Sequence, residues 1–478
     1  MSSETFHIFL AGADASSVRA LEVKSPWDGA VAGRTWLADA GQYEQAAQAC
    51  VEAAPAIAAI PVHERAAVLR RVSERLRGDP EPFARRIALE AGKPIKDATA
   101  EVARAAMTFE VAAEEARRLP GSGELIPMDL APHGEKRLAI ARRVPLGPIA
   151  AISPLNFPLN LVAHKLAPAF AAGNPVVLKP ASRTPLSALA LAGLMRECGL
   201  PPGALSVLPM DRDTGNALVE DDRFRMLTFT GSSEVGWAMK ARAGRKKVVL
   251  ELGGNAGVLV DASADVAHAV DRIVAGGFGY AGQSCIAVQR VYVHERRWDE
   301  FLEHLLPAVA GLRVGDPLDP QTVVGPLIST GDVERVETWI AEAVDGGATV
   351  LAGGSRVNET TFAPTVLTGV PHTARLCADE AFAPVVVCER IATFDEGVQA
   401  LNASAFGLQA GIFTADLERT LRAFDALEVG GVLVNDVPTY RIDHMPYGGV
   451  KDSGMGREGP RYAIEEMSEL RLLVVARR

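Results

Sequence analysis

The chain has 478 residues, of which 48% are hydrophobic and 23% charged, an ordinary composition for a globular protein. This length exceeds what one hydrophobic core serves, so two or three domains are expected. The formal net charge of −10 argues against a surface for nucleic acid or anionic membranes. No apolar run approaches the roughly 20 residues that a membrane-spanning helix needs.

The N-terminal stretch MSSETFHIFLAGADASS lacks a basic flank before an apolar core, so no secretory signal is expected. The five cysteines are odd in number, and no pair has the spacing of a metal site or a redox CxxC motif. This usage favours free thiols in a reducing cytoplasm. The nine histidines form no HExxH or similar cluster, so no metal is expected.

The N-terminal part of the chain, residues 42–118, predicts helices. In IKDATAEVARAAMTFEVAAEEARR, Val102, Ala106, Phe109 and Ala113 recur at steps of three and four residues. The next segment, LPGSGELIPMDLAPHGEKRLAIARRVPLG, is rich in Pro and Gly. It ends in alternating residues that predict an exposed strand pair.

From about residue 147, short apolar runs such as IAAIS, PVVLK, LSVLP, MLTFT and KVVLEL alternate with helical stretches. This alternation predicts a parallel, doubly wound sheet. A second series runs from Gly257 to about Asn435, with helices expected near 264–279, 296–310 and 331–345. Two successive α/β units predict two domains with a cleft between them. The alternating tail MSELRLLVVARR predicts a strand that completes another sheet, such as that of a partner subunit.

The stretch GQSCIAVQR contains Cys285, which is either an inert buried thiol or a nucleophile. The inert interpretation is favoured at the outset, because free cysteine is among the most buried residue types. A nucleophilic thiol has an ordinary pKa of ~8.5, so it needs a base or a positive environment. It also needs donors for the oxyanion formed on attack, and a group that activates water if the product is an acid.

Two polar residues could meet those needs. Glu251 ends the apolar strand in VVLELGGNAGVLV, at the end where α/β folds place their sites, although a surface glutamate would fit the pattern too. Asn156, in AAISPLNFPLN, could donate to an oxyanion or serve as a turn or cap residue.

Other motifs suggest a phosphate-bearing cofactor. In TFTGSSEVG, Gly231 follows a strand, and Ser232 stands at a helix start whose free amides can bind phosphate. Lys179 ends the strand PVVLK, where it could reach a ribose or its phosphate; an ordinary solvated lysine explains it equally well.

The motifs SPLNFPLN, KPASRTP, TFTGSSEVG, ELGGNAG, GQSC, DEAFAPV and MPYGGVKDSGMGREG resemble those of the aldehyde dehydrogenase superfamily in order and approximate spacing, over nearly the whole chain. The resemblance implies an α/β fold class, with a doubly wound, Rossmann-like cofactor domain, a doubly wound catalytic domain and a small β oligomerisation arm. It implies the following division: residues 1–120 and 142–254 for NAD(P) binding, 255–440 for the catalytic thiol domain, 121–141 and 462–478 for oligomerisation strands, and 441–461 for the substrate entrance.

The resemblance also implies roles in catalysis. Cys285 would attack the aldehyde carbon to give a thiohemiacetal and then a thioester, with Asn156 and the Cys285 backbone amide as the oxyanion hole. Glu251 would activate the water that hydrolyses the thioester. Its presence favours release of a free acid over acyl transfer to coenzyme A. Lys165 and Glu458 match positions linked to proton relay, and a structural ion pair is the alternative.

For the cofactor, the resemblance places Lys179 at the adenine ribose and Gly231 with Ser232 at the pyrophosphate. It places Glu380 at the nicotinamide ribose beside Phe382. Ile152 and Ser153 are assigned to the same cofactor site, as are Ser182 and Arg183. Ser182 stands where NAD-preferring members often carry glutamate, and Arg183 adds a positive charge, so NADP is expected, with NAD also usable.

The substrate is expected to be a short aldehyde with an anionic group, of the lactaldehyde, semialdehyde or glyceraldehyde-3-phosphate type. Arg104 matches an anion-binding position, and a helix-surface arginine paired with a glutamate is the alternative. Arg441 and His444 lie on the loop that shapes the entrance, and a carboxylate, phosphate or phosphonate would suit such a pocket. Ser284 stands where some phosphate-handling relatives carry arginine, which weakens the phosphate interpretation.

Two other functions would use the same fold: a thiol esterase without a redox role, and a non-catalytic scaffold. The intact set of cofactor positions argues against the first, and the retained reactive residues argue against the second. Relatives of this kind are homodimers or homotetramers, so the expected partners are a small-molecule aldehyde and further copies of the chain.

Overall fold

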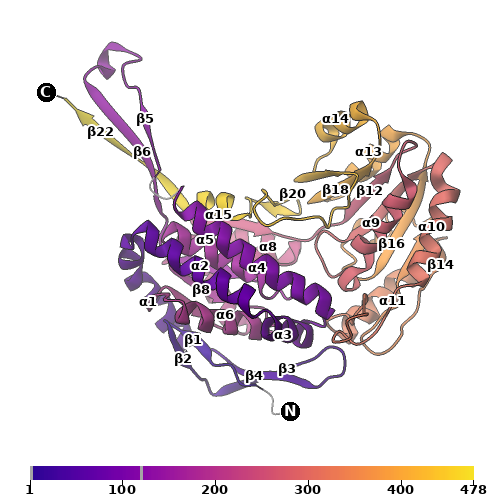
Figure 1. The fold of residues 1–478 in the computed structure, drawn as a ribbon, viewed down its shortest axis with the longest axis horizontal. Helices are drawn as coiled ribbons and strands as arrows, with labels where there is room; N and C mark the ends of the chain where they lie inside the picture. Colours follow the sequence, from indigo (N-terminus) through magenta and orange to yellow (C-terminus); the bar gives the residue numbers. More distant parts are fainter. Residues whose placement is uncertain (1–3, 119–121, 478) are drawn as a thin grey trace.

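The computed structural model describes residues 4–118 and 122–477, and it contains two α/β lobes with a β arm projecting from the first (Figure 1). Each lobe is built on its own mostly parallel sheet. The predicted fold class is therefore confirmed. Within the described part of the chain, no helix combines the length and apolar character needed to cross a membrane. No group of three or more His, Cys, Asp and Glu among the described residues could hold a metal ion.

The first sheet has the strand order β2-β1-β9-β8-β7-β10-β11-β21. Its five central strands, β9 to β11 in that order, run parallel. The bounds of these strands are β1 (Ile8–Leu10), β2 (Ala13–Ala15), β7 (Ile149–Ile152), β8 (Val176–Lys179), β9 (Leu205–Val207), β10 (Met226–Thr230), β11 (Lys247–Glu251) and β21 (Gly454–Met455).

Helices cover both faces of the first sheet, and α1 to α4 confirm the helices predicted for residues 42–118. The bounds are α1 (Ala40–Ala59), α2 (Val62–Gly78), α3 (Glu81–Ala91), α4 (Ile95–Ala116), α5 (Asn160–Ala172), α6 (Leu186–Glu197), α7 (Arg212–Glu220) and α8 (Ser233–Arg242). The hairpin of β3 (Arg19–Lys24) and β4 (Val31–Leu37) precedes them and was not predicted.

The second sheet has the order β14-β15-β16-β13-β12-β18-β19 and is parallel except for β14. Its strands are β12 (Ala256–Val260), β13 (Val288–His294), β14 (Thr349–Ala352), β15 (Thr365–Thr368), β16 (Val385–Ile391), β18 (Gln409–Phe413) and β19 (Gly431–Val434). Its helices are α9 (Val266–Phe278), α10 (Trp298–Ala310), α11 (Thr330–Asp345), α12 (Arg375–Ala378), α13 (Phe394–Asn402) and α14 (Leu417–Ala426). The three helices expected in this region correspond to α9, α10 and α11.

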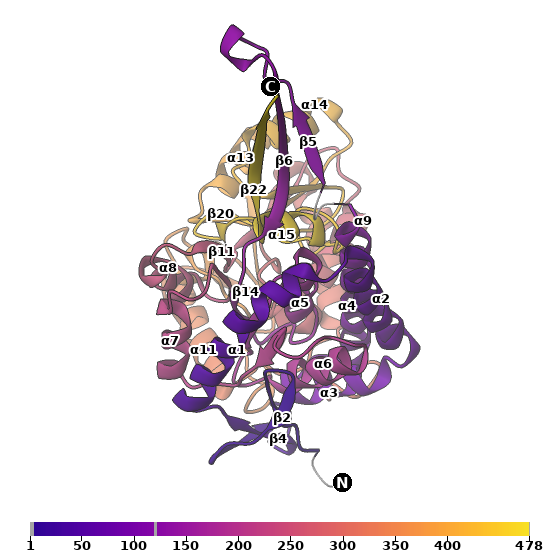
Figure 2. The same ribbon diagram turned by 90° about the vertical axis from the view of Figure 1, so that its left-hand side faces the viewer.

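The arm is an antiparallel sheet of β5 (Gly123–Ile126), β6 (Arg137–Pro145) and β22 (Ser468–Ala476), and it carries the C-terminal end of the described chain away from the body (Figure 2). The tail strand β22 thus pairs with β6 of its own chain. It begins later than residue 462, because α15 (Pro460–Glu466) precedes it. The expected boundary between residues 120 and 121 lies outside the described residues.

A short link between the two sheets determines where a site can form. The carboxyl end of β11 and the amino end of β12 are separated only by residues 252–255. The carboxyl edge of the first sheet therefore meets the amino edge of the second. A short antiparallel ladder pairs β17 (Phe406–Gly407), which precedes β18, with β20 (Val450–Lys451) in the segment that follows the second sheet.

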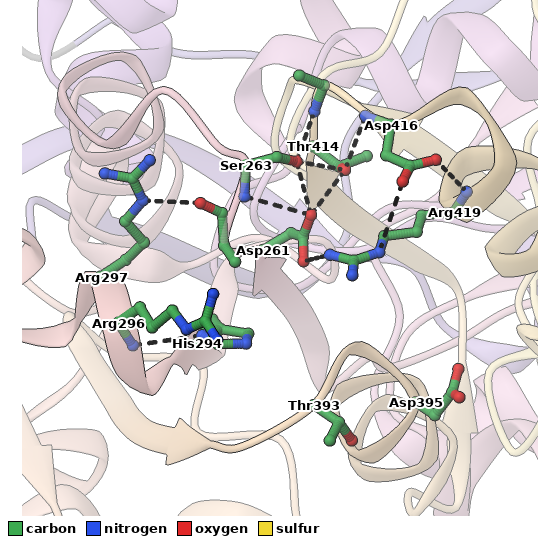
Figure 3. Close-up of polar contacts among 12 residues, drawn as sticks. Asp261, Ser263, His294, Arg296, Arg297, Thr393, Asp395, Thr414, Asp416 and Arg419 are labelled. Atoms are coloured by element: carbon green, nitrogen blue, oxygen red, sulfur yellow. Dashed lines mark hydrogen bonds and ion pairs between the residues drawn. The ribbon is translucent and has the colours of Figure 1, made fainter.

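The carboxyl edge of the second sheet, where an α/β fold often binds a ligand, is closed by internal contacts (Figure 3). Asp261 follows β12 and is fully buried. Its carboxylate pairs with Arg419 and accepts hydrogen bonds from the hydroxyls of Ser263, at 2.6 Å, and Thr414, at 3.0 Å. These contacts give the buried carboxylate its hydrogen-bond and ion-pair partners. The pair with Arg419 connects α14 to the end of β12.

A buried ion pair joins the helices to the first sheet. Lys93 and Glu101 are 1% exposed each and form a direct pair. Glu101 also accepts hydrogen bonds from the backbone amides of Leu159, at 2.9 Å, and Asn160, at 3.1 Å, at the start of α5. One carboxylate therefore neutralises a buried lysine and caps the helix that follows Asn156.

The Glu101→Ala substitution should destabilise the fold by about 3–5 kcal/mol, because it leaves the Lys93 ammonium buried without a partner. Urea unfolding of the purified protein measures this loss. The control is Glu110→Ala on the same helix, which removes a solvent-exposed pair with Arg77 and should cost about 0–1 kcal/mol. Equal losses in the two variants would contradict the structural role of Glu101.

Candidate active site

The loop that carries Cys285 is held in an unusual conformation. Tyr280 and Ala281 have φ values of 50° and 53°, and Gly282 has 68°. A Cβ atom at Gly282 would lie 2.1 Å from the carbonyl oxygen of Ala383, so only glycine fits. The close approach fixes the Cys285 loop against the loop that contains Glu380.

The Cys285 side chain is half-buried, whereas the other four cysteines are buried. It packs with Ile286, Leu408 and Tyr447, and its Sγ lies 3.0 Å from the Tyr447 Oη. Desolvation by the surrounding protein raises the pKa of the Cys285 thiol to about 12. The resting thiol is therefore protonated, and its reaction requires removal of the proton.

Asn156 follows β7 and contacts the Cys285 loop directly. Its side chain is 5% exposed, and Nδ2 donates to the Gln283 carbonyl at 3.0 Å. An amide has two N–H donors, so this contact orients the side chain and leaves one donor for an oxygen beside Cys285. The geometry suits the oxyanion-hole assignment, which remains a proposal.

Glu251 ends β11, is 3% exposed, and faces the same region. Neither of its carboxylate oxygens has a hydrogen-bond partner among the described residues. Burial, followed by the like charge of Glu458, raises the pKa of Glu251 well above its usual range. A Cβ atom at Gly448 would lie 2.8 Å from Oε1, so a glycine there leaves room for the carboxylate.

Lys165 and Glu458 form a buried pair behind Glu251. Lys165 Nζ lies 3.7 Å from Glu458 Oε1 and donates to the hydroxyls of Thr228, at 3.1 Å, and Thr230, at 2.8 Å. Burial lowers the pKa of Lys165, while Glu458 opposes that shift. The pair has the contacts of a structural ion pair, and it also lies where it could exchange a proton with Glu251.

The carboxyl edge of the first sheet gathers most of the expected cofactor residues. Strand register places Ile152 beside Lys179. The Lys179 side chain packs against α7 at Gly215. A Cβ atom at Gly215 would lie 2.8 Å from the Lys179 Cε. The Ser153 hydroxyl is buried and lacks a partner in the described chain, so it could serve a bound ligand.

The start of α8 has backbone amides that could bind an anion. Gly231 leads into Ser232, which caps α8 without a side-chain hydrogen bond, so the first amides of the helix stay free for an anion. A Cβ atom at Gly231 would lie 2.5 Å from Phe229 Cζ, which explains the glycine. This cradle fits the phosphates of a dinucleotide.

Glu380 and Phe382 reach the site from the second lobe. The Glu380 carboxylate accepts from the Gly254 amide at 2.9 Å, and burial raises its pKa to about 7. Gln289, which the sequence analysis did not identify, holds this loop: its Oε1 accepts from Ala381 at 2.9 Å and its Nε2 donates to Asp379 at 2.8 Å. The sequence signal that could have identified Gln289 is its position four residues after Cys285. Phe382 has a φ of 47°, a rare value that these contacts maintain.

Ser182 and Arg183 lie beyond Lys179 and are both exposed. The Ser182 hydroxyl donates to the Met210 carbonyl at 3.4 Å, and Arg183 donates to the Ile328 carbonyl at 3.3 Å. In the sequence they follow the lysine assigned to the ribose by three and four positions.

Arg104 contacts an aspartate that the sequence analysis missed, and Arg441 is linked to the same aspartate through His164. Arg104 makes a two-pronged contact with Asp443, at 3.0 and 3.2 Å, so its partner is an aspartate from another segment and not a helix glutamate. Asp443 also contacts His164 Nε2 at 2.9 Å, and Arg441 lies 3.3 Å from the same nitrogen. Neighbouring Asn160 donates to Asp443 at 2.9 Å.

The four candidate substrate-binding residues differ in their burial and contacts. Arg441 is buried and pairs with Glu458 at 3.1 Å, so it lies inside the site. Arg104 has a side chain 29% exposed and faces the Phe157 ring. His444 is exposed on the entrance loop, and Ser284 is half-buried next to the thiol. Only Arg104 and Arg441 therefore join the central network.

A partly open thiol between two α/β lobes, with a phosphate cradle on one of them, defines the class of thiol-dependent oxidoreductases that use a dinucleotide. Comparison with known proteins specifies the family. The profile of the aldehyde dehydrogenase family matches residues 13–473, and the chain belongs to that family. The protein is therefore an enzyme that acts on aldehydes, as the sequence resemblance predicted.

Individual relatives are similar over most of their length. The 3-sulfolactaldehyde dehydrogenase of Priestia aryabhattai is 47% identical over 414 residues, which cover 86% of each chain. The crystal structure of aldehyde dehydrogenase 21 from Physcomitrella patens, in complex with the reaction product succinate, is 45% identical. It has a TM-score of 0.97 and covers 100% of this chain and 99% of that chain. The glyceraldehyde-3-phosphate dehydrogenase of Methanocaldococcus jannaschii, complexed with NADP, is 37% identical with a TM-score of 0.91, covering 96% and 99%.

The raised pKa of Glu251 predicts how hydrolysis depends on pH. Its basic form becomes more abundant as pH rises, so turnover of 4-nitrophenyl acetate should increase with pH, at higher pH than an ordinary glutamate would require. Glu251→Gln should lower steady-state turnover by about 100-fold or more and remove the part of the pH dependence due to Glu251. The initial burst of nitrophenol should remain, because Cys285 still becomes acylated. A variant that keeps wild-type steady-state turnover would contradict the assignment of Glu251 as the water base.

Proposed function

We propose that the enzyme oxidises a short aldehyde bearing a carboxylate or sulfonate to the corresponding acid, with NADP or NAD as hydride acceptor. The observation that carries this proposal is the convergence of Cys285, Asn156 and Glu251 beside the arginine network around Asp443. The thiol, the amide and the carboxylate come from three separate segments and meet at the junction of the two sheets.

The reaction begins when Cys285 loses its proton and its sulfur forms a bond to the aldehyde carbon. The carbonyl oxygen becomes an oxyanion that accepts hydrogen bonds from Asn156 and from the Cys285 backbone amide. When bound, the nicotinamide supplies hydride acceptance, which leaves the substrate carbon at the oxidation level of a thioester. Glu251 then takes a proton from water as the water attacks, and the C–S bond breaks to release the acid.

Glu251 has to be deprotonated before it can act as this base. Lys165 and Glu458 lie behind it, and the network continues through Arg441 towards Asp443 and Arg104. We propose that the Lys165–Glu458 pair exchanges protons with Glu251 during turnover. Their fixed separation of 3.7 Å and full burial keep this exchange away from bulk water.

The substrate class is supported by charge and by relatives. Arg104 and Arg441 supply cationic groups near the thiol, while Ser284 adds no charge. The sulfolactaldehyde enzyme and the succinate complex named above both concern short molecules with a second anionic group. A sulfonate or carboxylate would contact Arg104 at its exposed edge and share that guanidinium with Asp443.

The experiment is a panel of short carboxylated, sulfonated, phosphorylated and neutral aldehydes, followed by reduced-nicotinamide absorbance. Arg104→Ala should raise KM for succinic semialdehyde by about 10- to 100-fold, the effect of losing a charge-assisted hydrogen bond. It should change kcat/KM for propanal by less than about threefold. Arg118→Ala, whose arginine pairs on the surface with Glu115, is the control.

A uniform loss with anionic and neutral aldehydes in Arg104→Ala would contradict the anion-binding role. Activity confined to neutral aldehydes in the wild type would contradict the substrate class. Absence of reduced nicotinamide with every aldehyde would contradict the proposed reaction.

For the cofactor, we propose that NADP is accepted and NAD is also used. Ser182 is exposed and carries no negative charge that would repel a 2′-phosphate, and Arg183 beside it is positive. The Methanocaldococcus jannaschii relative named above was solved with NADP.

Ser182→Glu should lower kcat/KM for NADP by at least about tenfold relative to NAD, because the carboxylate repels the phosphate. Initial rates with both cofactors measure the ratio. Ser182→Ala removes the hydroxyl without adding charge and should leave the ratio nearly unchanged. An unaltered ratio in Ser182→Glu would show that another segment determines the preference.

We further propose that the arm mediates assembly into a homodimer or homotetramer. Apolar side chains lie exposed on it, among them Leu125, Leu470, Leu472, Leu473 and Val475. The proposed domain limits follow the sheets: residues 1–120 and 142–254 around the first, and 255–440 around the second. The free thiol chemistry fits work in the reducing cytoplasm.

A further inference from the structure

The hydroxyl of Tyr447 contacts the sulfur that the proposed function makes the nucleophile. Cys285 Sγ and Tyr447 Oη are 3.0 Å apart, within hydrogen-bond distance for sulfur. Tyr447 is 3% exposed and packs with Ile286, Leu408 and Cys285 in one small cluster. The phenol therefore reaches the thiol from the side of the substrate-entrance segment.

Tyr447 is fixed in place from two directions. Its backbone amide donates to the Glu458 carbonyl at 3.1 Å, and its carbonyl accepts from the Glu458 amide at 2.6 Å. The Arg441 guanidinium lies over its ring, 3.6 Å from the centroid. A cation over the ring face also draws electron density from the phenol, which makes the hydroxyl a better donor.

The direction of the hydrogen bond follows from the protonation states. Burial holds the pKa of Tyr447 well above its usual range, so the phenol stays neutral and keeps its proton. Once Cys285 has lost its proton, the sulfur can only accept, and Tyr447 can only donate. Among the charged groups that face the sulfur, Glu380 and Glu251 disfavour the thiolate, and Arg441 favours it.

We propose that Tyr447 is a catalytic residue whose hydroxyl donates a hydrogen bond to the Cys285 thiolate, stabilising it and directing it before attack on the aldehyde. This inference rests on Cys285 being the reactive thiol. The hydrogen bond satisfies one acceptor direction of the sulfur and leaves another for the bond to carbon. It thus compensates part of the desolvation that the half-buried position imposes.

The test is the pH dependence of iodoacetamide alkylation in the ligand-free enzyme, with the labelled peptide identified by mass spectrometry. Tyr447→Phe removes only the hydroxyl and keeps the ring under Arg441. Its alkylation profile should move to higher pH by about one unit, which lowers the rate at pH 8 by about tenfold. Aldehyde kcat should fall by about the same factor, with KM changed by less than about twofold.

Tyr440→Phe is the matched control, because Tyr440 is 46% exposed and lies outside the thiol cluster. Its profile should coincide with that of the wild type. Thermal unfolding of both variants is the check that each keeps the fold. Coincident profiles for wild type and Tyr447→Phe, with label on Cys285, would overturn this inference alone. Label on a different cysteine would instead overturn the assignment of Cys285, and with it the proposed function.

Discussion

The active site depends on the short connection between β11 and β12. Gly253 and Gly254 lie in this connection, and each approaches another chain segment too closely for a side chain. A Cβ atom at Gly253 would lie 2.7 Å from Glu380 Oε2, and one at Gly254 would lie 2.0 Å from the Cys285 carbonyl oxygen. Glu251, Cys285 and Glu380 are thus held together by one stretch of backbone. Because the stretch is short, the first sheet contributes its carboxyl edge and the second its amino edge.

In the resting protein, burial favours the neutral forms of the two central groups, Cys285 and Glu251. Burial raises the pKa values of both Cys285 and Glu251, and neither has a nearby positive charge sufficient to reverse the effect. The cations of the site are committed to other partners, with Arg441 on Glu458 and Arg104 on Asp443. A buried network of this kind keeps the thiol unreactive towards solvent species. It also makes each deprotonation sensitive to hydrogen-bond donors within a few ångströms.

Much of the fold and of the candidate site could be predicted from the sequence, since apolar runs and helical periodicity are local signals. The strands ending in Lys179, Thr230 and Glu251 were recognised that way, and strand register then brings their ends together. Asp443, His164 and Gln289 could not be identified, because their importance comes from contacts with residues more than 80 positions away. The tail strand was recognised from the alternation in MSELRLLVVARR, and it corresponds to β22.

The pairing of Arg104 with Asp443 has a consequence for altering substrate range. Asp443 is 2% exposed, and its charge is balanced by groups that surround it inside the protein. Removing the arginine alone would leave this buried carboxylate with one cation fewer, which costs stability. A redesign for neutral substrates would therefore have to neutralise both partners together, for instance with a hydrophobic residue and an asparagine that keeps the contacts to Asn160 and His164. Under the proposed function, selectivity depends on a pair of residues from distant segments, and a change of substrate class requires coupled substitutions.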